Sequence, residues 1–298
     1  RDEVIVSSTG VIGQFLPIEK IAAGIRRAAD ELSEQGGSAA AEAIMTTDIF
    51  PKIAVAQEEI GGKTITLAGI AKGSGMIHPN MATMPCFIVT DALIAAPMLR
   101  KMLTASVDRS FNMITVDGDT STNDMVLFMA NGAAGNKRVA PGSKDLKKLQ
   151  ACLDAVTHSL AMQIVKDGEG ATKFVEITVR GAKNPVEAKR AVSAVAKSSL
   201  VKTALFGEDA NWGRIMAVLG SCGVDMDEVR TDISFGKTKL VEKGVAMGRH
   251  AEKEAAAALK QREIHIVIDL HKGKGESTIW TCDLSTEYVK INAAYRSR

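Results

Sequence analysis

In Lys72-Gly-Ser-Gly-Met-Ile-His-Pro-Asn-Met-Ala-Thr-Met84, this chain of 298 residues combines flexible backbone with one lysine and one threonine hydroxyl. Gly73, Gly75 and Pro79 disfavour both a helix and a central strand, which predicts a shaped loop. The loop follows the apolar run Ile65 to Ala71, which has the composition of a strand. We therefore expect a loop at the end of a buried strand, with the other elements arranged around it.

The overall composition is that of an ordinary globular protein without a charge bias. Hydrophobic residues make up 46% of the chain, and 37 basic residues stand against 35 acidic ones. No block of five like charges occurs, so neither a nucleic acid nor a membrane surface has electrostatic support as a partner. Small charged metabolites remain open as ligands. The length suits one large domain or two smaller ones.

The sequence also predicts a cytoplasmic protein without a metal site. The four cysteines are widely spaced and form no Cys-x-x-Cys or Cys/His cluster, which favours reduced, buried thiols over disulfides or zinc ligands. No apolar run approaches the roughly 18 residues of a membrane span, and no signal-peptide pattern opens the chain. Because residue 1 is Arg1 and not methionine, we expect that an upstream piece is absent.

Hydrophobic periodicity predicts alternating helices and strands. Helical spacing marks residues 18–32, 98–111, 145–166, 185–205 and 251–260. Apolar or alternating runs mark strands at 4–6, 52–57, 63–71, 86–90, 174–179, 215–220 and 231–235. The runs 52–57 and 63–71 flank Gly61-Gly62 and predict a hairpin. A terminal hairpin is expected to pair 263–270 with 277–284.

The mixed order of these elements indicates a layered α/β (α+β) sandwich with mixed sheets, and not a doubly wound parallel sheet. The composition changes after Gly168-Glu169-Gly170, where a carboxylate between two glycines is well placed to meet a substrate cation. We therefore expect a domain boundary just after this turn. It would separate a first domain of residues 1–172 from a smaller C-terminal α/β domain of residues 173–298.

The stretch Thr115-Val-Asp-Gly-Asp-Thr-Ser-Thr-Asn-Asp124 has the density of polar groups of a calcium loop. With Asp117 at the first position, however, the required glycine falls on Thr122 and the bidentate glutamate on Phe128, so a calcium site is not supported. We prefer a turn whose polar side chains bind their own backbone, placed near a functional site.

Common reaction motifs do not fit the loop that begins at Lys72. A phosphate-binding loop needs its lysine after the glycines, and a dinucleotide fingerprint needs a third glycine and a helix where Pro79 stands. The Gly-x-Ser-x-Gly elbow of serine hydrolases is absent from the sequence. Thr83 could act as a nucleophile if the bond before it were cut, because the freed α-amine has a pKa near 8 and suits a general base.

Several motifs in a fixed order give the chain a family resemblance. Taken together, they resemble the self-cleaving ornithine acetyltransferase (glutamate N-acetyltransferase) family of arginine biosynthesis, over essentially the whole chain. The motifs are Ser8-Thr-Gly-Val-Ile-Gly13, Lys72-Gly-x-Gly-Met76 with Asn80-Met-Ala-Thr-Met84, Thr115 to Asp124, Lys166-Asp-Gly-Glu-Gly-Ala-Thr172 and Asn211-Trp-Gly-Arg-Ile215.

The resemblance implies an N-terminal-nucleophile-like enzyme that cuts itself between Ala82 and Thr83. The products would be an α chain of residues 1–82 and a β chain of residues 83–298, assembled as a dimer of αβ units. Thr83 would then take acetyl from N2-acetyl-L-ornithine as an ester and pass it to L-glutamate, which predicts ping-pong kinetics. No cofactor is implied, although some members of the family also use acetyl-CoA as a donor.

Site residues are also implied by the resemblance. Thr9 and Gly10 resemble the oxyanion hole, which agrees with a glycine-containing turn whose N–H groups are free. Lys72 can neutralise a substrate carboxylate, and Glu169 can pair an ammonium. Without the resemblance, we would interpret both as ordinary surface charges. The substrate-binding set comprises Lys72, Thr83, Glu169, Asn292 and Ser297, plus one threonine of the Thr46-Thr47 pair, with Thr46 favoured by spacing.

The chain also departs from the family pattern. Pro85 and Cys86 stand where simple apolar residues are expected, and Pro85 could alter strand pairing beside the nucleophile. His78 is a tempting base, but we interpret it as a polar loop residue. Two other functions remain open: a self-processed amidohydrolase or aminopeptidase, and an amino-acid-binding protein without enzymatic activity.

Overall fold

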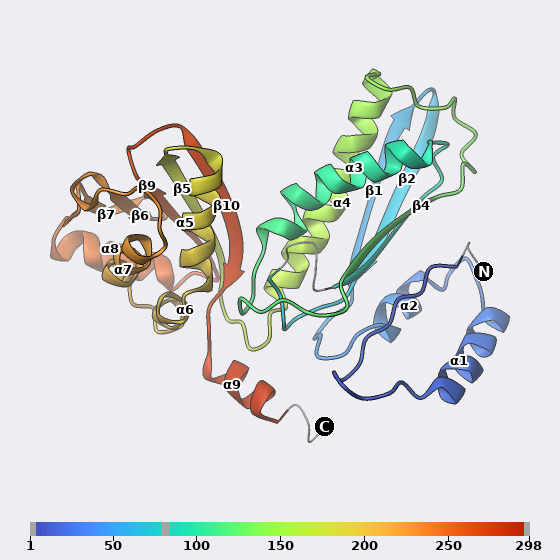
Figure 1. Cartoon of the computed structure of the whole chain (residues 1–298), viewed down its shortest axis with the longest axis horizontal. Coiled ribbons are helices and arrows are strands. Elements are labelled where there is room, and N and C mark those ends of the chain that lie inside the picture. The colour runs from blue at the N-terminus through green and yellow to red at the C-terminus, as the bar shows by residue number, and fades with distance from the viewer. Residues whose placement is uncertain (1–3, 79–83, 295–298) are drawn as a thin grey trace.

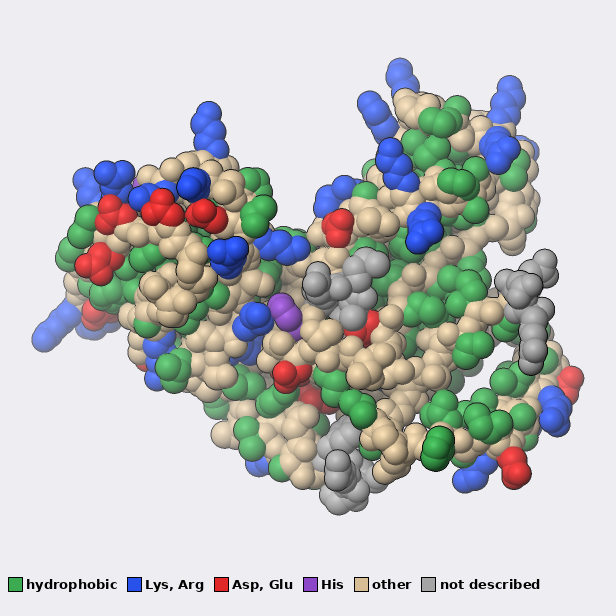
Figure 2. Space-filling model, viewed as in Figure 1, with side chains coloured by type: hydrophobic (Ala, Val, Ile, Leu, Met, Phe, Trp, Pro, Cys, Tyr) green, Lys and Arg blue, Asp and Glu red, His purple; other side chains and the backbone are tan. Residues whose placement is uncertain are grey.

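The computed structural model describes residues 4–78 and 84–294. Within these ranges the strands form two sheets, and Figure 1 shows them as two lobes side by side. The space-filling view in Figure 2 shows a deep notch between the lobes. The expected cleavage point between Ala82 and Thr83 lies outside the described residues, as does Ser297.

The first sheet has the order β1-β2-β3-β4. The β1–β2 and β2–β3 pairs are antiparallel, whereas β4 runs parallel to β3. The predicted glycine hairpin is confirmed: Ile60 pairs with Lys63, and Gly61 and Gly62 take φ values of 58° and 77°, which a two-residue hairpin turn requires. The strands are β1 (Lys52–Ile60), β2 (Lys63–Ala71), β3 (Pro85–Thr90) and β4 (Met125–Ala130).

Two helices cover one face of this sheet. Helix α4 (Lys144–Lys166) packs on β1 and β2, and α3 (Ala96–Arg109) packs beside α4; a short 3-10 helix, η1 (Phe111–Met113), follows α3. The apolar stripe predicted for α4 is buried, including Leu149, Leu153 and Leu160. On the opposite face, alternate strand residues are exposed; these are Ile53, Val55, Val89 and Met129.

The second sheet has the order β10-β5-β9-β6-β7-β8. Its strands are β5 (Phe174–Ala182), β6 (Asp232–Phe235), β7 (Thr238–Glu242), β8 (Val245–Ala246), β9 (Glu263–Asp269) and β10 (Gly275–Cys282). The helices of this lobe are α5 (Pro185–Lys197), α6 (Ser199–Phe206), α7 (Trp212–Ser221) and α8 (Arg249–Leu259), with the 3-10 helix η2 (Glu228–Arg230).

The predicted terminal hairpin is wrong. Strand β5 lies between β9 and β10, parallel to β9 and antiparallel to β10. The connection from β9 to β10 crosses the end of β5, where the carbonyl of Gly181 accepts the N–H groups of Lys272 and Gly273. Alternation along a strand predicts which residues face the core, but it does not identify the neighbouring strand.

Three other segments differ from the prediction. Residues 215–220 belong to helix α7 and not to a strand, because Ile215 and Leu219 are buried four residues apart on one helix face. The helix expected over 185–205 is divided where Ser198 caps α6. Residues Val4 to Val6 form no strand, since no described strand pairs with them, and their side chains are 61–79% exposed.

The N-terminal region packs only slightly on the sheets, through contacts of its second helix with β1. Helix α1 (Ile18–Asp30) has the predicted helical spacing, but none of its residues is buried; α2 (Gly37–Ala43) follows it. Apolar side chains are exposed along this region, as Figure 2 shows, and Phe15 and Ile25 are 105% and 64% exposed. The periodicity identified the helix but not what its apolar face contacts.

Each sheet has its own apolar core. One cluster of buried residues extends from Ala54 to Phe174 and includes Cys282, and the other extends from Val175 to Ile279. The chain therefore passes from one core to the other between Phe174 and Val175. The division into domains of residues 1–172 and 173–298 stays a prediction, since it concerns units that fold separately.

Candidate functional site

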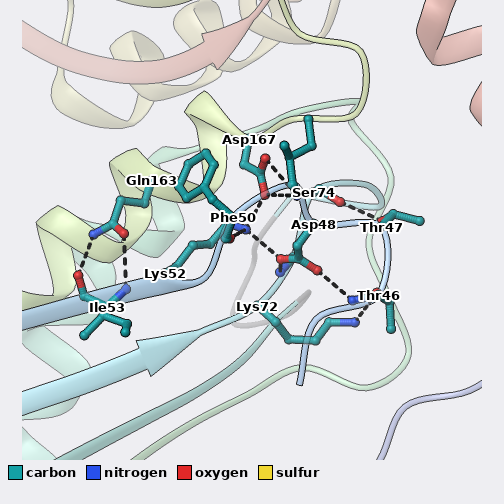
Figure 3. Close-up of polar contacts among 12 residues, drawn as sticks. Thr46, Thr47, Asp48, Phe50, Lys52, Ile53, Lys72, Ser74, Gln163 and Asp167 are labelled. Atoms are coloured by element: carbon teal, nitrogen blue, oxygen red, sulfur yellow. Dashed lines mark hydrogen bonds and ion pairs between the residues drawn. The ribbon is translucent and has the colours of Figure 1, made fainter. Parts of the chain in front are cut away.

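Four segments converge where strand β2 ends. They are the loop that begins at Lys72, the Thr46–Asp48 segment before β1, the Gly168–Thr172 loop after α4, and helix α9 (Thr286–Ala293), which follows β10. Figure 3 shows the first two of these segments meeting the end of α4. Local sequence explains the convergence, because the glycines end β2 and Gly168 lies just beyond the C-cap of α4.

A buried ion-pair cluster lies beneath these segments. The Lys52 ammonium is 2.6 Å from Oδ1 of Asp48 and 2.5 Å from Oδ2 of Asp167, and none of the three side chains is exposed. Removing such charges from water is costly, so the pairing must be close and the remaining acceptor positions filled. Backbone N–H groups fill them: Asp48 accepts from Gly73 at 2.7 Å, and Asp167 accepts from Ile49 at 3.0 Å.

The two carboxylates respond differently to the shared ammonium. Burial acts to raise the pKa of Asp48, but the hydrogen bond from Gly73 and the Lys52 ammonium outweigh it, so the pKa is lowered. Burial raises the pKa of Asp167, and Lys52 offsets only part of that rise. Asp48 is therefore the more firmly ionised partner, and it is the one that holds the loop that begins at Lys72.

Lys72 presents its ammonium beside a threonine hydroxyl. Its Nζ donates to Oγ1 of Thr46 at 2.7 Å, and the residue is only 9% exposed. Burial lowers the pKa of Lys72, and the nearby Asp48 carboxylate partly offsets this. Thr47 faces elsewhere: its hydroxyl is 2.7 Å from that of Ser74. Of the two threonines, Thr46 is the one in contact with Lys72.

Glu169 lies against the same loop. Its N–H donates to the carbonyl of Ser74 at 2.8 Å, and its Oε2 accepts from Nδ2 of Asn292, also at 2.8 Å. A Cβ at Gly75 would lie 2.4 Å from that Oε2, so only glycine allows the loop to approach the carboxylate this closely. The structure thus brings a carboxylate, a cation and an amide together along Lys72 to Gly75.

Helix α9 is attached to the Gly168–Thr172 loop. The Ser285 hydroxyl donates to the carbonyl of Gly170 at 2.6 Å, and Asp283 accepts from the Thr172 hydroxyl, also at 2.6 Å. Gly170 has a φ of 68°, and a Cβ there would lie 2.6 Å from the backbone nitrogen of Tyr288. These contacts bring Asn292 to Glu169, although the two are 123 residues apart in sequence.

Other expected residues are not joined to this group. Thr9 and Gly10 lie in an exposed segment, and within the described ranges neither makes a hydrogen bond to Lys72, Glu169 or Asn292. Thr83, Ala82 and Ser297 lie outside the described residues. The roles assigned to these residues stay predictions.

Sequence reasoning missed the buried cluster. One signal was available: Lys52 and Ala54 alternate along a predicted strand, which puts the lysine on the same inward face as the alanine. A lysine facing the core requires an acidic partner. The identity of those partners, Asp48 and Asp167, follows only from the tertiary structure.

Residues 4–78 and 84–294 contain neither a cluster of metal-ligating side chains nor a membrane-spanning helix. In the part of the chain that is described, no three His, Cys, Asp or Glu side chains are grouped so as to hold a metal ion. Over the same residues, no helix has the length and apolarity needed to cross a bilayer.

Known proteins match the chain along nearly all of its length. The model of the ArgJ family matches residues 1–297. The arginine biosynthesis bifunctional protein ArgJ of Symbiobacterium thermophilum is 54% identical, over 98% of this chain and 72% of that protein. The protein of the same name from Geobacter sulfurreducens is 51% identical, over 99% of this chain and 75% of that protein.

One solved structure is also similar. A chain of the arginine biosynthesis bifunctional protein ArgJ from Bacillus halodurans, in a crystal structure, has a TM-score of 0.67 and 42% identity. The match covers 70% of this chain and 98% of the solved one. Together with the two mixed sheets, this likeness confirms the predicted fold class.

The first prediction concerns the buried cluster. Lys52→Met leaves the carboxylates of Asp48 and Asp167 buried without their cation, so we expect the free energy of unfolding to fall by about 3–5 kcal/mol. Urea denaturation measures this change. Lys148→Met is the matched control, because the ion pair of Lys148 with Glu58 is exposed and contributes little. Equal unfolding free energies for the two variants would contradict the prediction.

The second prediction concerns Asp124, which lies at the start of β4. Both carboxylate oxygens are buried, and burial raises the pKa of Asp124 to about 6, with the nearby Ser121 hydroxyl offsetting only part of the rise. The folded state therefore binds this proton more tightly than the unfolded state, so the stability that the protonated group contributes is lost as pH rises through about 6.

In Asp124→Asn this loss is absent. We expect the melting temperature of the wild type to fall more between about pH 4 and pH 7 than that of Asp124→Asn. The reason is that the side chain at position 124 loses a proton in this range only in the wild type. Thermal unfolding followed over this pH range measures the difference. Asp119→Asn removes an exposed acid of the same segment and should keep the wild-type profile.

Proposed function

Because the chain belongs to the ArgJ family, we propose that it transfers acetyl from N2-acetyl-L-ornithine to L-glutamate through an acetyl ester of Thr83. Its relatives are named as bifunctional enzymes of arginine biosynthesis, and we assign this acyltransferase to the same pathway. The observation that carries the proposal is the placement of Lys72 and Glu169 at one end of the loop that leads to Thr83. These two side chains match the opposite charges of an amino-acid substrate.

Thr83 acts first as the nucleophile of self-cleavage and only afterwards as the nucleophile of acetyl transfer. Its hydroxyl attacks the carbonyl carbon of Ala82, the C–N bond of the peptide breaks as the nitrogen takes up a proton, and water then hydrolyses the resulting ester. The products are a carboxylate on Ala82 and an α-amine on Thr83. The cut would leave a β chain of residues 83–298. The length of this β chain is close to the 70% of the present chain that the match to the solved relative covers, and the same match covers 98% of the relative.

Transfer then proceeds in two half-reactions. The α-amine of Thr83 takes the proton from Oγ, which attacks the acetyl carbonyl of acetylornithine; the C–N bond breaks and the departing amine receives the proton. Ornithine leaves, and the neutral amine of glutamate attacks the ester carbonyl. A new C–N bond forms, the bond between the acetyl carbon and Oγ of Thr83 breaks, and the proton lost by the glutamate nitrogen restores the Thr83 hydroxyl. Thr9 and Gly10 would stabilise the oxyanion in both halves.

The described residues account for recognition of the donor. The Lys72 ammonium, held beside Thr46, is available to a substrate carboxylate, and the buried Glu169 carboxylate is available to an ammonium. Asn292 orients Glu169 by donating to one of its oxygens. Ser297 would add a further contact from the C-terminal tail.

Other features of the proposal follow the family expectation. The enzyme would need no cofactor, and acetyl-CoA would serve as a second acetyl donor. We place it in the cytoplasm, as a dimer of αβ units.

A self-processed amidohydrolase or aminopeptidase is the alternative function. Such an enzyme would also cleave itself before Thr83, but it would transfer the acyl group to water. Acetylornithine would then yield free acetate even with glutamate present, whereas the transferase yields acetylglutamate. Product analysis by mass spectrometry separates the two.

The third prediction tests the nucleophile. Thr83→Ala lacks the hydroxyl that attacks in both self-cleavage and transfer, so it should remain one chain of about 31.6 kDa and produce no acetylglutamate. Intact-mass measurement with and without acetylornithine reports the cut and the acetyl adduct together. Thr104→Ala, on the exposed face of α3, should behave as the wild type. An uncut wild-type chain with full transfer activity would rule out the mechanism.

The fourth prediction tests Lys72. Lys72→Met removes a charged contact made in both the bound substrate and the transition state, so we expect KM for acetylornithine to rise by roughly 10- to 100-fold with a smaller change in kcat. Steady-state kinetics on fully cut protein measures both constants. Lys63→Met, an exposed lysine at the start of β2, is the control. Unchanged KM in Lys72→Met would exclude the proposed carboxylate contact.

A further inference from the structure

The polar stretch that follows η1 has no role in the substrate contacts, yet it lies against the loop that leads to Thr83. Thr115 donates its hydroxyl to the carbonyl of Ile77 at 3.0 Å, and the N–H of Val116 donates to the same carbonyl at 2.7 Å. The Thr120 hydroxyl donates to the carbonyl of His78 at 3.2 Å. These bonds hold the chain just upstream of residues 79–83.

Asp117 makes the densest of these contacts. Its Oδ2 accepts from the N–H of Met76 at 2.6 Å, and its Oδ1 accepts from the N–H of Ile77 at 3.0 Å. The N–H of Asp119 and the hydroxyl of Tyr288 donate to the same carboxylate. Four donors fill the acceptor capacity of a carboxylate, so the interpretation of this stretch as a turn that binds only its own backbone is incomplete.

The conformation that Asp117 stabilises is a strained one. Met76 has a φ of 57°, in the left-handed region that side chains with a Cβ rarely adopt. Such a residue keeps this conformation only where its surroundings impose it, and strained backbone is concentrated at functional sites. Here the two successive N–H groups bound by Asp117 impose it.

The same stretch also holds the chain downstream of residues 79–83. The N–H of Met125 donates to the carbonyl of Met84 at 3.2 Å, and Met125 pairs with Pro85 in the parallel register of β3 and β4. Pro85 takes the first position of β3, where a proline is tolerated. The segment Thr115–Met125, which we call the framing segment, therefore anchors both sides of residues 79–83.

From this arrangement we propose that the framing segment positions the Ala82–Thr83 bond for self-cleavage, with Asp117 as the positioning residue. The inference rests on the proposed function, because it concerns the cut that exposes Thr83. Attack on the preceding carbonyl requires an uncommon backbone geometry, and anchoring both flanks lowers the entropy that must be lost to reach it. The cut breaks the covalent link between residues 76–78 and Thr83, so the upstream anchors can position Thr83 through the chain before the cut but not after it.

Two variants with matched controls test the proposal. Asp117→Asn replaces one acceptor oxygen by an amide donor that cannot accept a backbone N–H, so it should slow cleavage at least tenfold. The control, Asp119→Asn, removes a neighbouring exposed charge and should leave the cleavage rate unchanged. Thr120→Val removes one exposed hydroxyl that reaches His78 and should slow cleavage about fivefold, with Thr122→Val as its control. Intact mass followed after a short pulse of synthesis gives the rates.

A second measurement separates positioning from a general folding defect. In the cut fraction of Thr120→Val, KM and kcat should stay within about twofold of the wild type, because the lost bond is to the carbonyl of His78, which the cut separates from Thr83. A folding defect would instead lower both cleavage and transfer. Cleavage of Asp117→Asn and Thr120→Val at the wild-type rate would overturn the inference and leave the proposed function standing. A wild-type chain that is not cut would instead refute the proposed function.

Discussion

The buried contact of the Lys52 ammonium with Asp48 and Asp167 is the interaction on which the candidate site depends. It joins the first strand of one sheet to the end of α4 and, through Asp48, to the loop that begins at Lys72. A buried ammonium cannot be left without its carboxylates, so these three segments are bound to one arrangement. Gly73 is held there by its N–H bond to Asp48, and Thr46 and Lys72 lie beside the cluster, as Figure 3 shows.

Next to this cluster, the arrangement depends on segments that approach one another closely at glycine residues, and not on charge. Gly75 admits the Glu169 carboxylate and Gly170 admits helix α9, and at each position a Cβ would lie within 2.6 Å of the neighbouring atom. The glycines therefore allow three loops and a helix to share a small volume, and Asn292 reaches Glu169 as a result. The ion pairs of Lys52 therefore hold the segments beneath the site together, and the close approach allowed by Gly75 and Gly170 brings the remaining segments to it.

The polar side chains around the loop that begins at Lys72 have two kinds of role. In the enzyme that we propose, Lys72 and Glu169 would contact the substrate, whereas the Asp117 carboxylate binds the N–H groups of Met76 and Ile77. Both oxygens of Asp117 are already bound to N–H and O–H donors, so this carboxylate holds the backbone and is not free to bind a ligand.

Short-range pattern determined much of this protein. Periodicity identified α4, a glycine pair identified the β1–β2 hairpin, and the ordered motifs identified the family. The resemblance also predicted Lys72, Glu169 and Asn292 as site residues, and the structure places all three around one loop. Tertiary structure alone decided that β5 separates β9 from β10, that residues 215–220 are helical, and that Lys52 meets Asp48 and Asp167. The reason is physical: a local pattern records which face of an element is buried, whereas the partner on that face is chosen by contacts across more than a hundred residues.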